Sequence, residues 1–466
     1  MSEPVAVPLW LLVVLVGLAL LAALEWLLLP SVRWYFRRKV RRVMDEISTR
    51  FKIELPEFKL TQRRALLDRL TTDPRVLAAV HRQVVDSGVP RDVLMQRVHR
   101  YAGEIVPAFN AYVYFRVGYW LAKTFAQMAY RVRLGYTDQA ALAAIQPSST
   151  VVFVMNHRSN MDYVLVSFLA AERVALSYAV GEWARIWPLQ GLIRAMGAYF
   201  VRRNSGDPLY RMVLQRYVQM ATEGGVPQAM YPEGGLTTDG RLREPKLGLL
   251  DYMVKGFDPA GQRDLVFIPV GINYDRVLED RSLLRKLDPS AHGVGVWRKL
   301  AIVARFASRQ SILAVLGRRY RHGYACVNFG TPLSMRGHVA AHGLDFRGLD
   351  DAGRREPVAA LGKILMARIG AVVPVPLVAS VLLRDEARAI SDLELKSAVQ
   401  ALMDRVEAAG GHVYVPRTDR DYALTVGLRM LTLRGLVEER DGLFQANPAE
   451  LTILRYYANS IAHLVA

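Results

Sequence analysis

The sequence contains one cysteine, Cys326, among 466 residues. One thiol can form neither an internal disulfide nor a cysteine-based zinc site, so the chain suits a reducing compartment and is expected to need no structural metal. An acidic excess is also lacking, since 61 lysines and arginines face 43 aspartates and glutamates, a net charge of +18. This balance favours anionic partners such as phospholipid headgroups, nucleotide phosphates or nucleic acid, without choosing among them.

No lysine or arginine precedes the first apolar run, Leu9 to Leu29, and the first basic residue is Arg33. A cleaved signal peptide carries basic residues before its apolar run and is therefore disfavoured. At about 1.5 Å per residue the run reaches about 30 Å, a bilayer core, which predicts a membrane-anchoring helix over residues 1–32. The basic cluster at 33–42 predicts a cytoplasmic chain on the inner membrane. Pro8 and Glu25 leave a half-inserted helix as an alternative.

Three further parts follow the predicted anchor. Residues 33–131 read as amphipathic helices, and the aromatic-rich Phe109 to Tyr130 fits either a membrane-surface helix or a core-facing one. Residues 132–340 alternate strand-like and helical runs, which predicts an α/β domain with a mostly parallel mixed sheet flanked by helices. Residues 341–466 read as helical again. There Val372 to Leu383 is expected to be buried or interfacial, and Tyr422 to Gln445 to form a helix and a hairpin resembling a winged-helix wing.

Within the α/β part, individual elements follow from apolar runs and helical spacing. The predicted strands are Thr150–Met155, Val174–Val180, Tyr199–Arg203, Pro227–Tyr231, Leu265–Asn273 and Ala325–Phe329. The predicted helices between them are Met161–Ala171, Pro208–Thr222 and Leu247–Phe257. In such sheets, functional sites gather at the carboxyl ends of the strands.

The strand predicted from Val151 to Met155 leads into His157, and Asp162 follows five residues later. A helix is expected to start near residue 160, which places Asp162 in its first turn. Its carboxylate can then accept the Nδ1 proton of His157 and leave Nε2 free to act as a base. Taken alone, the pair is equally well explained as a loop histidine and a carboxylate that complements the helix dipole.

Three more motifs fall at predicted strand ends. Gly197 to Arg203, GAYFVRR, ends in paired arginines that suit a phosphate. Met230 to Gly240, MYPEGGLTTDG, combines Glu233 with two small glycines that allow close backbone approach. Leu265 to Val277, LVFIPVGINYDRV, supplies a fourth strand end. Each motif alone is weak evidence, but turns and solvated faces do not explain four of them in this order.

This set resembles the glycerolipid acyltransferase superfamily, specifically its glycerol-3-phosphate and dihydroxyacetone-phosphate acyltransferase branch. The segments REPKLGLLD (243–251), VNFGTPL (327–333), the Pro-rich 373–379 and LRYYANSIAHL (454–464) extend the resemblance over roughly residues 100–466. It implies that His157, held by Asp162, deprotonates the 1-hydroxyl of glycerol 3-phosphate, which attacks the thioester of acyl-CoA or acyl carrier protein directly. The product would be lysophosphatidic acid for phospholipid synthesis, made without a cofactor or metal.

The resemblance also implies a set of substrate-binding residues. Arg202, Arg203 and Lys246 would neutralise the acceptor phosphate, and Glu233 with its two glycines would shape the phosphate pocket. Backbone N–H groups at the helix start after His157 are the expected oxyanion donors. The substrate-binding residues implied are Arg158, Ser159, Phe200, Arg202, Arg203, Glu233, Gly234, Gly235 and Lys246.

One departure from the family pattern concerns the acceptor. Where the family reads EGG or EGT followed by Arg-Ser-Arg, this chain reads Leu236, Thr237 and Thr238. Either the arginines at 202, 203, 241 and 243 compensate, or the acceptor is another one, such as dihydroxyacetone phosphate or lysophosphatidic acid. The donor type, acyl chain length and oligomeric state stay open.

Two other classes of protein compete with an acyltransferase. The basic charge and wing-like tail fit a membrane-tethered nucleic-acid-binding protein, although the arginines are spread along the chain, so no nucleic-acid partner is expected. A lipid-binding scaffold with an inactive acyltransferase fold is the other class. The intact His157 and Asp162 disfavour it.

Overall fold

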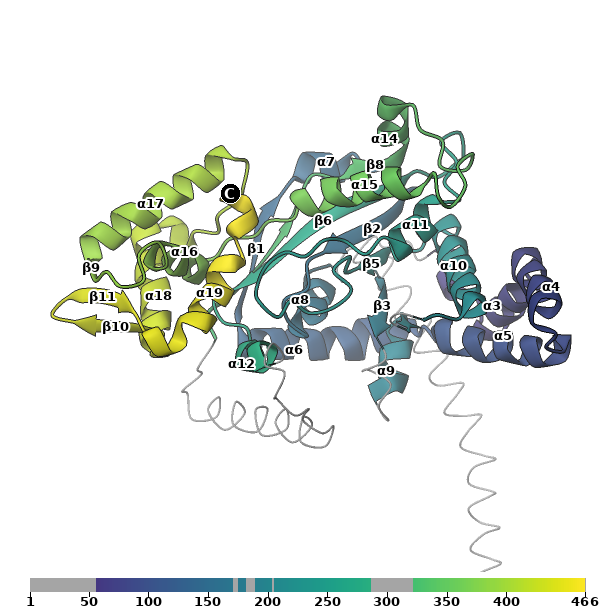
Figure 1. Ribbon diagram of the computed structural model, residues 1–466, viewed down its shortest axis with the longest axis horizontal. Coiled ribbons are helices and arrows are strands. Elements are labelled where there is room, and N and C mark those ends of the chain that lie inside the picture. The colour runs from purple at the N-terminus through teal and green to yellow at the C-terminus, as the bar shows by residue number, and fades with distance from the viewer. Residues whose placement is uncertain (1–55, 171–174, 182–188, 203–204, 286–321, 466) are drawn as a thin grey trace, which may run out of the picture. The chain divides into compact units, whose positions relative to one another are not determined.

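The computed structural model describes residues 56–170, 175–181, 189–202, 205–285 and 322–465 (Figure 1). They belong to one compact unit. The apolar run from Leu9 to Leu29 and the basic cluster at 33–42 lie outside the described residues. Among the described residues, no helix is both long enough and apolar enough to cross a membrane. The membrane helix and the four-part division of the chain therefore stay predictions.

A mixed, eight-stranded sheet forms the centre of this unit (Figure 1). Its strand order is β1-β7-β6-β2-β5-β3-β4, with β8 beside β6. Strands β6, β2, β5, β3 and β4 are parallel, whereas β7 and β8 run antiparallel to β6, and β1 is parallel to β7. The predicted mostly parallel mixed sheet is confirmed. The strands are β1 (Arg131–Thr137), β2 (Thr150–Met155), β3 (Ser177–Gly181), β4 (Ala198–Val201), β5 (Gln228–Met230), β6 (Leu265–Tyr274), β7 (Tyr324–Phe329) and β8 (Leu333–Ser334).

Helices pack on both faces of the sheet. Val152 and Val154 of β2 belong to one apolar core and Phe153 and Met155 to the other, the alternation of a strand buried on both faces. The first core includes α3 (Arg63–Thr71), α4 (Pro74–Ser87), α5 (Arg91–Ile105), α10 (Pro208–Glu223), α11 (Gly248–Val254), α14 (Met335–His342) and α15 (Arg355–Ala367). The second includes α6 (Tyr119–Ala129), α8 (Met161–Ala170), α16 (Pro374–Leu382), α17 (Asp392–Ala408), α18 (Arg420–Thr432) and α19 (Leu451–Asn459). Shorter helices are α2 (Glu57–Leu60), η1 (Val113–Gly118), α7 (Gln139–Ala143), α9 (Leu189–Ala195), α12 (Asp280–Leu284), η4 (Pro416–Thr418), η5 (Pro448–Glu450) and η6 (Ala462–Leu464).

The predicted strands and helices of the α/β part agree with the structure to within a few residues. The prediction misses β1, because its sequence RVRLGYT mixes arginines with a glycine and carries no apolar run. β1 lies at one edge of the sheet, where its side chains are half-buried or exposed. Gly135 lies close to β7, and a Cβ there would lie 2.1 Å from Asn328 Oδ1, so a larger residue would have to displace that side chain.

The carboxyl-terminal part confirms two predictions. The segment from Val372 to Leu383 contains α16, which is buried and begins at Pro374, a residue suited to the first helical position. Helix α18 is followed by the hairpin β10 (Val437–Arg440) and β11 (Leu443–Ala446), which also pairs with β9 (Ile390–Ser391). The hairpin turn uses Asp441 and Gly442, both at positive φ.

The aromatic stretch from Phe109 to Tyr130 forms η1 and α6, and part of it faces the core, whereas its membrane-surface alternative stays a prediction. Ala122 and Ala126 of α6 are buried in the core, whereas Trp120 and Phe125 are exposed. One face of the helix thus packs on the protein, and another presents aromatic rings outward.

Candidate active site

His157 lies in the loop between β2 and α8, at the carboxyl end of β2. Its Nδ1 is 2.9 Å from Oδ2 of Asp162. The carboxylate of Asp162 is fully buried. It also accepts the N–H groups of Arg158, at 2.7 Å, and Ser159, at 3.0 Å, and the hydroxyl of Tyr274, at 2.5 Å. Because these four donors fix the carboxylate, Nδ1 of His157 carries the proton and Nε2 is left free to act as a base.

The end of β6 holds the loop from one side. The side chain of Asn156 exchanges two hydrogen bonds with the backbone of Ile272, at 2.9 and 2.8 Å. Two residues further along β6, Tyr274 reaches Asp162. The sequence singles out this strand for Pro269, but it gives no signal that Asn156 and Tyr274 meet the catalytic loop, because those contacts depend on the pairing of β2 with β6.

The segment after β5 holds the loop from the other side. Tyr231 stacks on the ring of His157, with 4.1 Å between ring centroids. Glu233 is buried and accepts the N–H of His157, at 2.7 Å, and that of Arg243, at 3.2 Å. Burial raises the pKa of Glu233, and the N–H of His157 opposes that shift. Glu233 therefore braces the backbone of His157.

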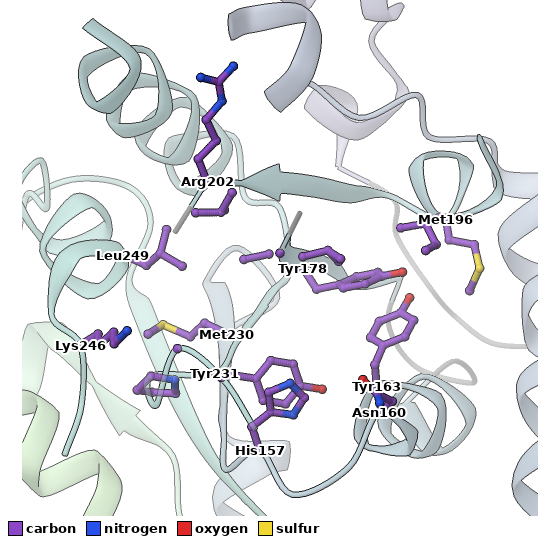
Figure 2. Close-up of a pocket in the computed structure, with 18 of the residues that line it drawn as sticks. His157, Asn160, Tyr163, Tyr178, Met196, Arg202, Met230, Tyr231, Lys246 and Leu249 are labelled. Carbon is purple, nitrogen blue, oxygen red and sulfur yellow. The ribbon is translucent and has the colours of Figure 1, made fainter. Parts of the chain in front are cut away.

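His157 lies on the wall of a pocket of about 480 Å³ (Figure 2). In the view of Figure 2, Lys246 and Leu249 lie on one side of His157. Tyr163, Tyr178 and Met196 lie on the other side. We call the first side, with Arg202, Ser205 and Arg211, the cationic arm. The second, lined by residues of α6, α8, β3 and α9, is the apolar arm.

The pocket contains some of the predicted site residues and excludes others. Those that line it are His157, Arg202, Gly234, Gly235 and Lys246. Arg203 lies outside the described residues. Arg158, Ser159, Phe200 and Glu233 are predicted to contact substrate, but the structure buries all four away from the pocket lining. Phe200 packs in the core of the sheet, and Ser159 donates through Oγ to Glu279, at 2.8 Å.

Arg202 lines the pocket, but its charge is already compensated. Its guanidinium donates to both carboxylate oxygens of Glu104 on α5, from Nε at 3.0 Å and from Nη2 at 2.7 Å. It also lies 4.9 Å from the ring centroid of Tyr101 and 5.0 Å from that of Tyr210. In Figure 2 the guanidinium points away from His157. Arg202 therefore offers an anionic ligand less charge than the sequence suggests.

Two other cations line the same arm. Within the described part of the chain, neither Lys246 nor Arg211 has a carboxylate partner. The stem of Lys246 lies over Gly234, which has a φ of +67°, and a Cβ there would lie 2.6 Å from Cδ of the lysine. Arg211 lies on α10 and is a pocket residue that the sequence analysis missed. The only feature of the sequence that points to Arg211 is its position in the first turn of a helix, shortly after a strand that ends in arginines.

The segment from Leu236 to Thr238 does not line the pocket, contrary to the expectation that it faces the substrate. The N–H of Thr237 donates to the carbonyl of His157, at 2.9 Å, and its hydroxyl bonds within the turn that follows. Arg243 donates to the hydroxyl of Thr238, and neither it nor Arg241 lines the pocket. The predicted compensation by Arg241 and Arg243 is thus not seen.

The backbone donors expected after His157 are mostly engaged. The N–H groups of Arg158 and Ser159 bind Asp162, and that of Met161 binds Oγ of Ser159. In the described part of the chain, the N–H groups of the pocket residues Asn160 and Gly235 have no acceptor. These two donors could receive negative charge in the pocket. The described residues hold no cluster of three or more His, Cys, Asp or Glu side chains placed to bind a metal ion.

Two family models match the chain. The model described as Acyltransferase matches residues 139–273, and the one described as Glycerol-3-phosphate acyltransferase C-terminal region matches residues 310–466. The solved 1-acyl-sn-glycerophosphate (LPA) acyltransferase of Thermotoga maritima is 14% identical, with a TM-score of 0.30 over 66% of this chain and 96% of that one.

Curated relatives are named glycerol-3-phosphate acyltransferase. The one from Pseudomonas putida (strain W619) is 28% identical over 429 residues, which are 87% of this chain and 49% of that protein. The one from Xanthomonas axonopodis pv. citri (strain 306) is 30% identical over 316 residues, 67% of this chain and 34% of that protein. The chain thus spans about half the length, or less, of these relatives.

The two matched regions contain the residues that build the site. The first includes the His157–Asp162 pair, the brace Glu233 and the pocket residue Lys246, and the second includes the tail from 454 to 464. Three of the four motifs contribute residues to one pocket, and both family models describe acyltransferase regions. The chain therefore contains an acyltransferase region and a glycerol-3-phosphate acyltransferase C-terminal region, and it is similar to curated glycerol-3-phosphate acyltransferases.

Proposed function

We propose that this protein transfers a fatty acyl group from acyl-CoA or acyl carrier protein to the 1-hydroxyl of glycerol 3-phosphate, giving lysophosphatidic acid for phospholipid synthesis. The observation that carries the proposal is the position of His157 and Asp162 between a cationic arm and an apolar arm of one pocket. A small phosphorylated acceptor fits the cationic arm, and an acyl chain fits the apolar arm. The base then stands where the hydroxyl and the thioester meet.

The chemistry requires one base and no covalent enzyme intermediate. Nε2 of His157 accepts the proton of the hydroxyl as its oxygen attacks the thioester carbonyl. The tetrahedral oxyanion collapses, the carbon–sulfur bond breaks, and the imidazolium returns the proton to the leaving thiolate. The carboxylate of Asp162 stabilises the imidazolium in between. The N–H groups of Asn160 and Gly235 are the proposed oxyanion donors. Neither a metal nor a cofactor takes part.

The acceptor phosphate is assigned to Lys246 and Arg211. Both line the cationic arm, and no carboxylate neutralises either of them within the described part of the chain. Charge-assisted hydrogen bonds contribute about 1.5–3 kcal/mol each, so two free cations can replace the arginines that the family carries after its glycines. Arg202 contributes less because Glu104 already holds it. Gly234 and Gly235 leave room for the phosphate in the same arm.

Membrane attachment completes the proposal. The run from Leu9 to Leu29 would anchor the chain in the inner membrane, with the catalytic part on the cytoplasmic side. The exposed Trp120 on α6 supports a catalytic part that lies against lipid, because the same helix lines the apolar arm through Leu121 and Ala122. Acyl transfer next to the bilayer would release lysophosphatidic acid directly into the membrane.

The test is an acyl-transfer assay on the purified full chain in lipid. Glycerol 3-phosphate, dihydroxyacetone phosphate and lysophosphatidic acid are each supplied with palmitoyl-CoA and with palmitoyl-acyl carrier protein. Glycerol 3-phosphate is expected to be the best acceptor, and His157→Ala is expected to abolish turnover. Turnover that survives in the His157→Ala variant rules out the mechanism, and acylation of lysophosphatidic acid alone rules out the acceptor.

A further inference from the structure

The end of helix α19 contacts two loops of the active site, although it lies some 300 residues further along the chain. Asn459 donates through Nδ2 to the carbonyl of Asp239, at 2.9 Å, in the turn that follows the glycine pair. Asn273 at the end of β6 donates to Oγ of Ser460, at 3.1 Å. The carboxyl-terminal tail is thus joined both to the turn and to the strand that orients Asp162.

The turn at 237–241 is shaped to receive this helix. Gly240 has a φ of +84°, and a Cβ there would lie 1.9 Å from the carbonyl oxygen of Tyr456. Only glycine, which has no Cβ, can approach the backbone of α19 so closely at this position. The same turn donates the N–H of Thr237 to the carbonyl of His157, at 2.9 Å. A displacement of α19 would therefore shift the turn at 237–241, and the turn would shift His157 through the hydrogen bond of Thr237.

Arg158 is the third connection, and it lies directly beside the base. Its side chain is buried and bridges two backbone carbonyls, that of Gly240 at 2.8 Å and that of Ser460 at 2.6 Å. Its own N–H donates to Asp162. Its positive charge lies near the buried carboxylates of Asp162 and Glu233, which offsets part of the cost of burying all three. Arg158 thus links the catalytic loop, the turn and the tail at a single point.

We propose that the end of α19, residues 456–460, positions the catalytic base. Asn459 and Arg158 act as positioning residues: they fix the turn at 237–241 and the loop at 157–162 against one another, so that His157 stays aligned with the thioester. This inference rests on the proposed function. It gives the tail at 454–464, which lies within the region matched by the second family model, a role in the reaction.

The experiment compares Asn459→Ala with a matched control, Asn447→Ala. Asn447 also donates through Nδ2 to a backbone carbonyl, that of Gly435 at 2.8 Å, but it lies beside the β10–β11 hairpin and does not contact the site. Both variants lose a side-chain amide. Asn459→Ala loses one hydrogen bond and Asn447→Ala loses two, because Oδ1 of Asn447 also accepts the N–H of Ala449, at 3.0 Å. The full chain is used in lipid vesicles, and the readouts are kcat, KM for glycerol 3-phosphate, the thermal midpoint and backbone hydrogen exchange.

The Asn459→Ala variant is expected to lose about 10-fold or more in kcat, with KM for the acceptor unchanged, because misaligned reacting groups lower the rate of the bound state. Amides in 158–162 and 237–241 are expected to exchange faster in this variant only. Asn447→Ala is expected to keep the parent kcat, while its thermal midpoint falls at least as far as that of Asn459→Ala. Arg158→Lys, which keeps the charge but cannot bridge both carbonyls, is expected to show the same pattern as Asn459→Ala.

Equal kcat values for Asn459→Ala and Asn447→Ala would overturn the inference, as would faster exchange in the two loops without a loss of kcat. If the parent protein acylates none of the acceptors, the proposed function fails on its own. Hydrogen exchange then still decides whether α19 holds the loops, since unchanged exchange in Asn459→Ala would remove the link as well.

Discussion

The base and the cationic arm of the pocket are built in different ways. Asp162 is fully buried and is held by four donors, three of which belong to its own loop. The cations of the arm come from separate elements, and the partner of Arg202 comes from α5, 98 residues away in the sequence. The orientation of the base therefore follows from local sequence, whereas the charge that meets the substrate depends on long-range packing.

This difference explains how the chain can depart from the family pattern without losing its base. Leu236 and Thr238 stand where the family places its two arginines, and Thr237 between them donates its N–H to the carbonyl of His157. Arg211 enters the pocket from α10. Each cation of the arm lies on a different element, so a cation lost from one element can be replaced by a cation on another. Three of the four donors to Asp162 have no such freedom, because the loop that carries them also carries the base.

Replacing Asp162 by Asn tests the local half of the comparison and should have the largest effect. A neutral amide no longer fixes the Nδ1 proton of His157 or stabilises the imidazolium, so kcat is expected to fall roughly 10³- to 10⁴-fold. KM for glycerol 3-phosphate should change little, because Asp162 does not line the pocket. Steady-state kinetics with saturating palmitoyl-CoA separate the two constants.

Asp280→Asn is the matched control for that substitution. Asp280 is also buried, and it accepts the hydroxyl of Tyr457, at 2.6 Å, as well as the guanidinium of Arg434. Its loss should lower stability without removing a partner of the base. A similar fall of kcat in both variants would show that buried carboxylates act here only through stability, and the contrast between base and arm would then fail.

Replacing the cations of the arm should affect binding and leave the chemical step intact. Lys246→Met keeps the stem over Gly234 and removes one charge, which should raise KM for glycerol 3-phosphate roughly 10- to 100-fold at a nearly constant kcat. Arg211→Met should act in the same direction but more weakly, because the arginine is exposed at the rim. KM for palmitoyl-CoA provides the internal comparison.

Lys255→Met serves as the control for these two variants. Lys255 follows α11 and pairs with Asp351, at 2.7 Å, outside the pocket. It should leave both constants unchanged. If Lys246→Met lowers kcat instead of raising KM, the lysine acts on the reaction itself, and the separation between base and arm does not hold.

The sequence predicts the parts of the fold that depend on neighbouring residues. Strand β2 follows from its apolar run, and the contact of His157 with Asp162 follows from a spacing of five residues. The missed strand β1 is an edge strand with exposed polar residues, so it lacks the apolar signal of a buried strand. Arg158 shows the same limit, because its two acceptors, Gly240 and Ser460, are distant in the sequence.

The cationic arm could be predicted only in part. Lys246 and Arg202 were found because they belong to sequence motifs, but nothing in those motifs indicates that Glu104 neutralises Arg202. Arg211 was missed because a single arginine in a helix is usually a solvated surface residue. The net charge of a site depends on all the charged residues that folding brings together. A sequence motif shows only some of them and does not show their partners.

Glu104→Gln is expected to have the smallest effect on the kinetic constants, and it tests directly whether the net charge of the cationic arm sets the affinity for the acceptor. The pair of Glu104 with Arg202 is partly exposed, at 21% and 29% of the side chains, so it stabilises the fold by no more than about 1 kcal/mol. Removing the negative charge leaves Arg202 free to attract the acceptor phosphate. KM for glycerol 3-phosphate is therefore expected to fall about two- to fivefold, with kcat unchanged.

The double variant Glu104→Gln with Arg202→Met should lose this gain, because the cation that the substitution releases is then absent. A rise of KM in Glu104→Gln alone would mean that Glu104 holds Arg202 in place for the phosphate, and the charge of the arm would then be set by that ion pair and not by Lys246 and Arg211.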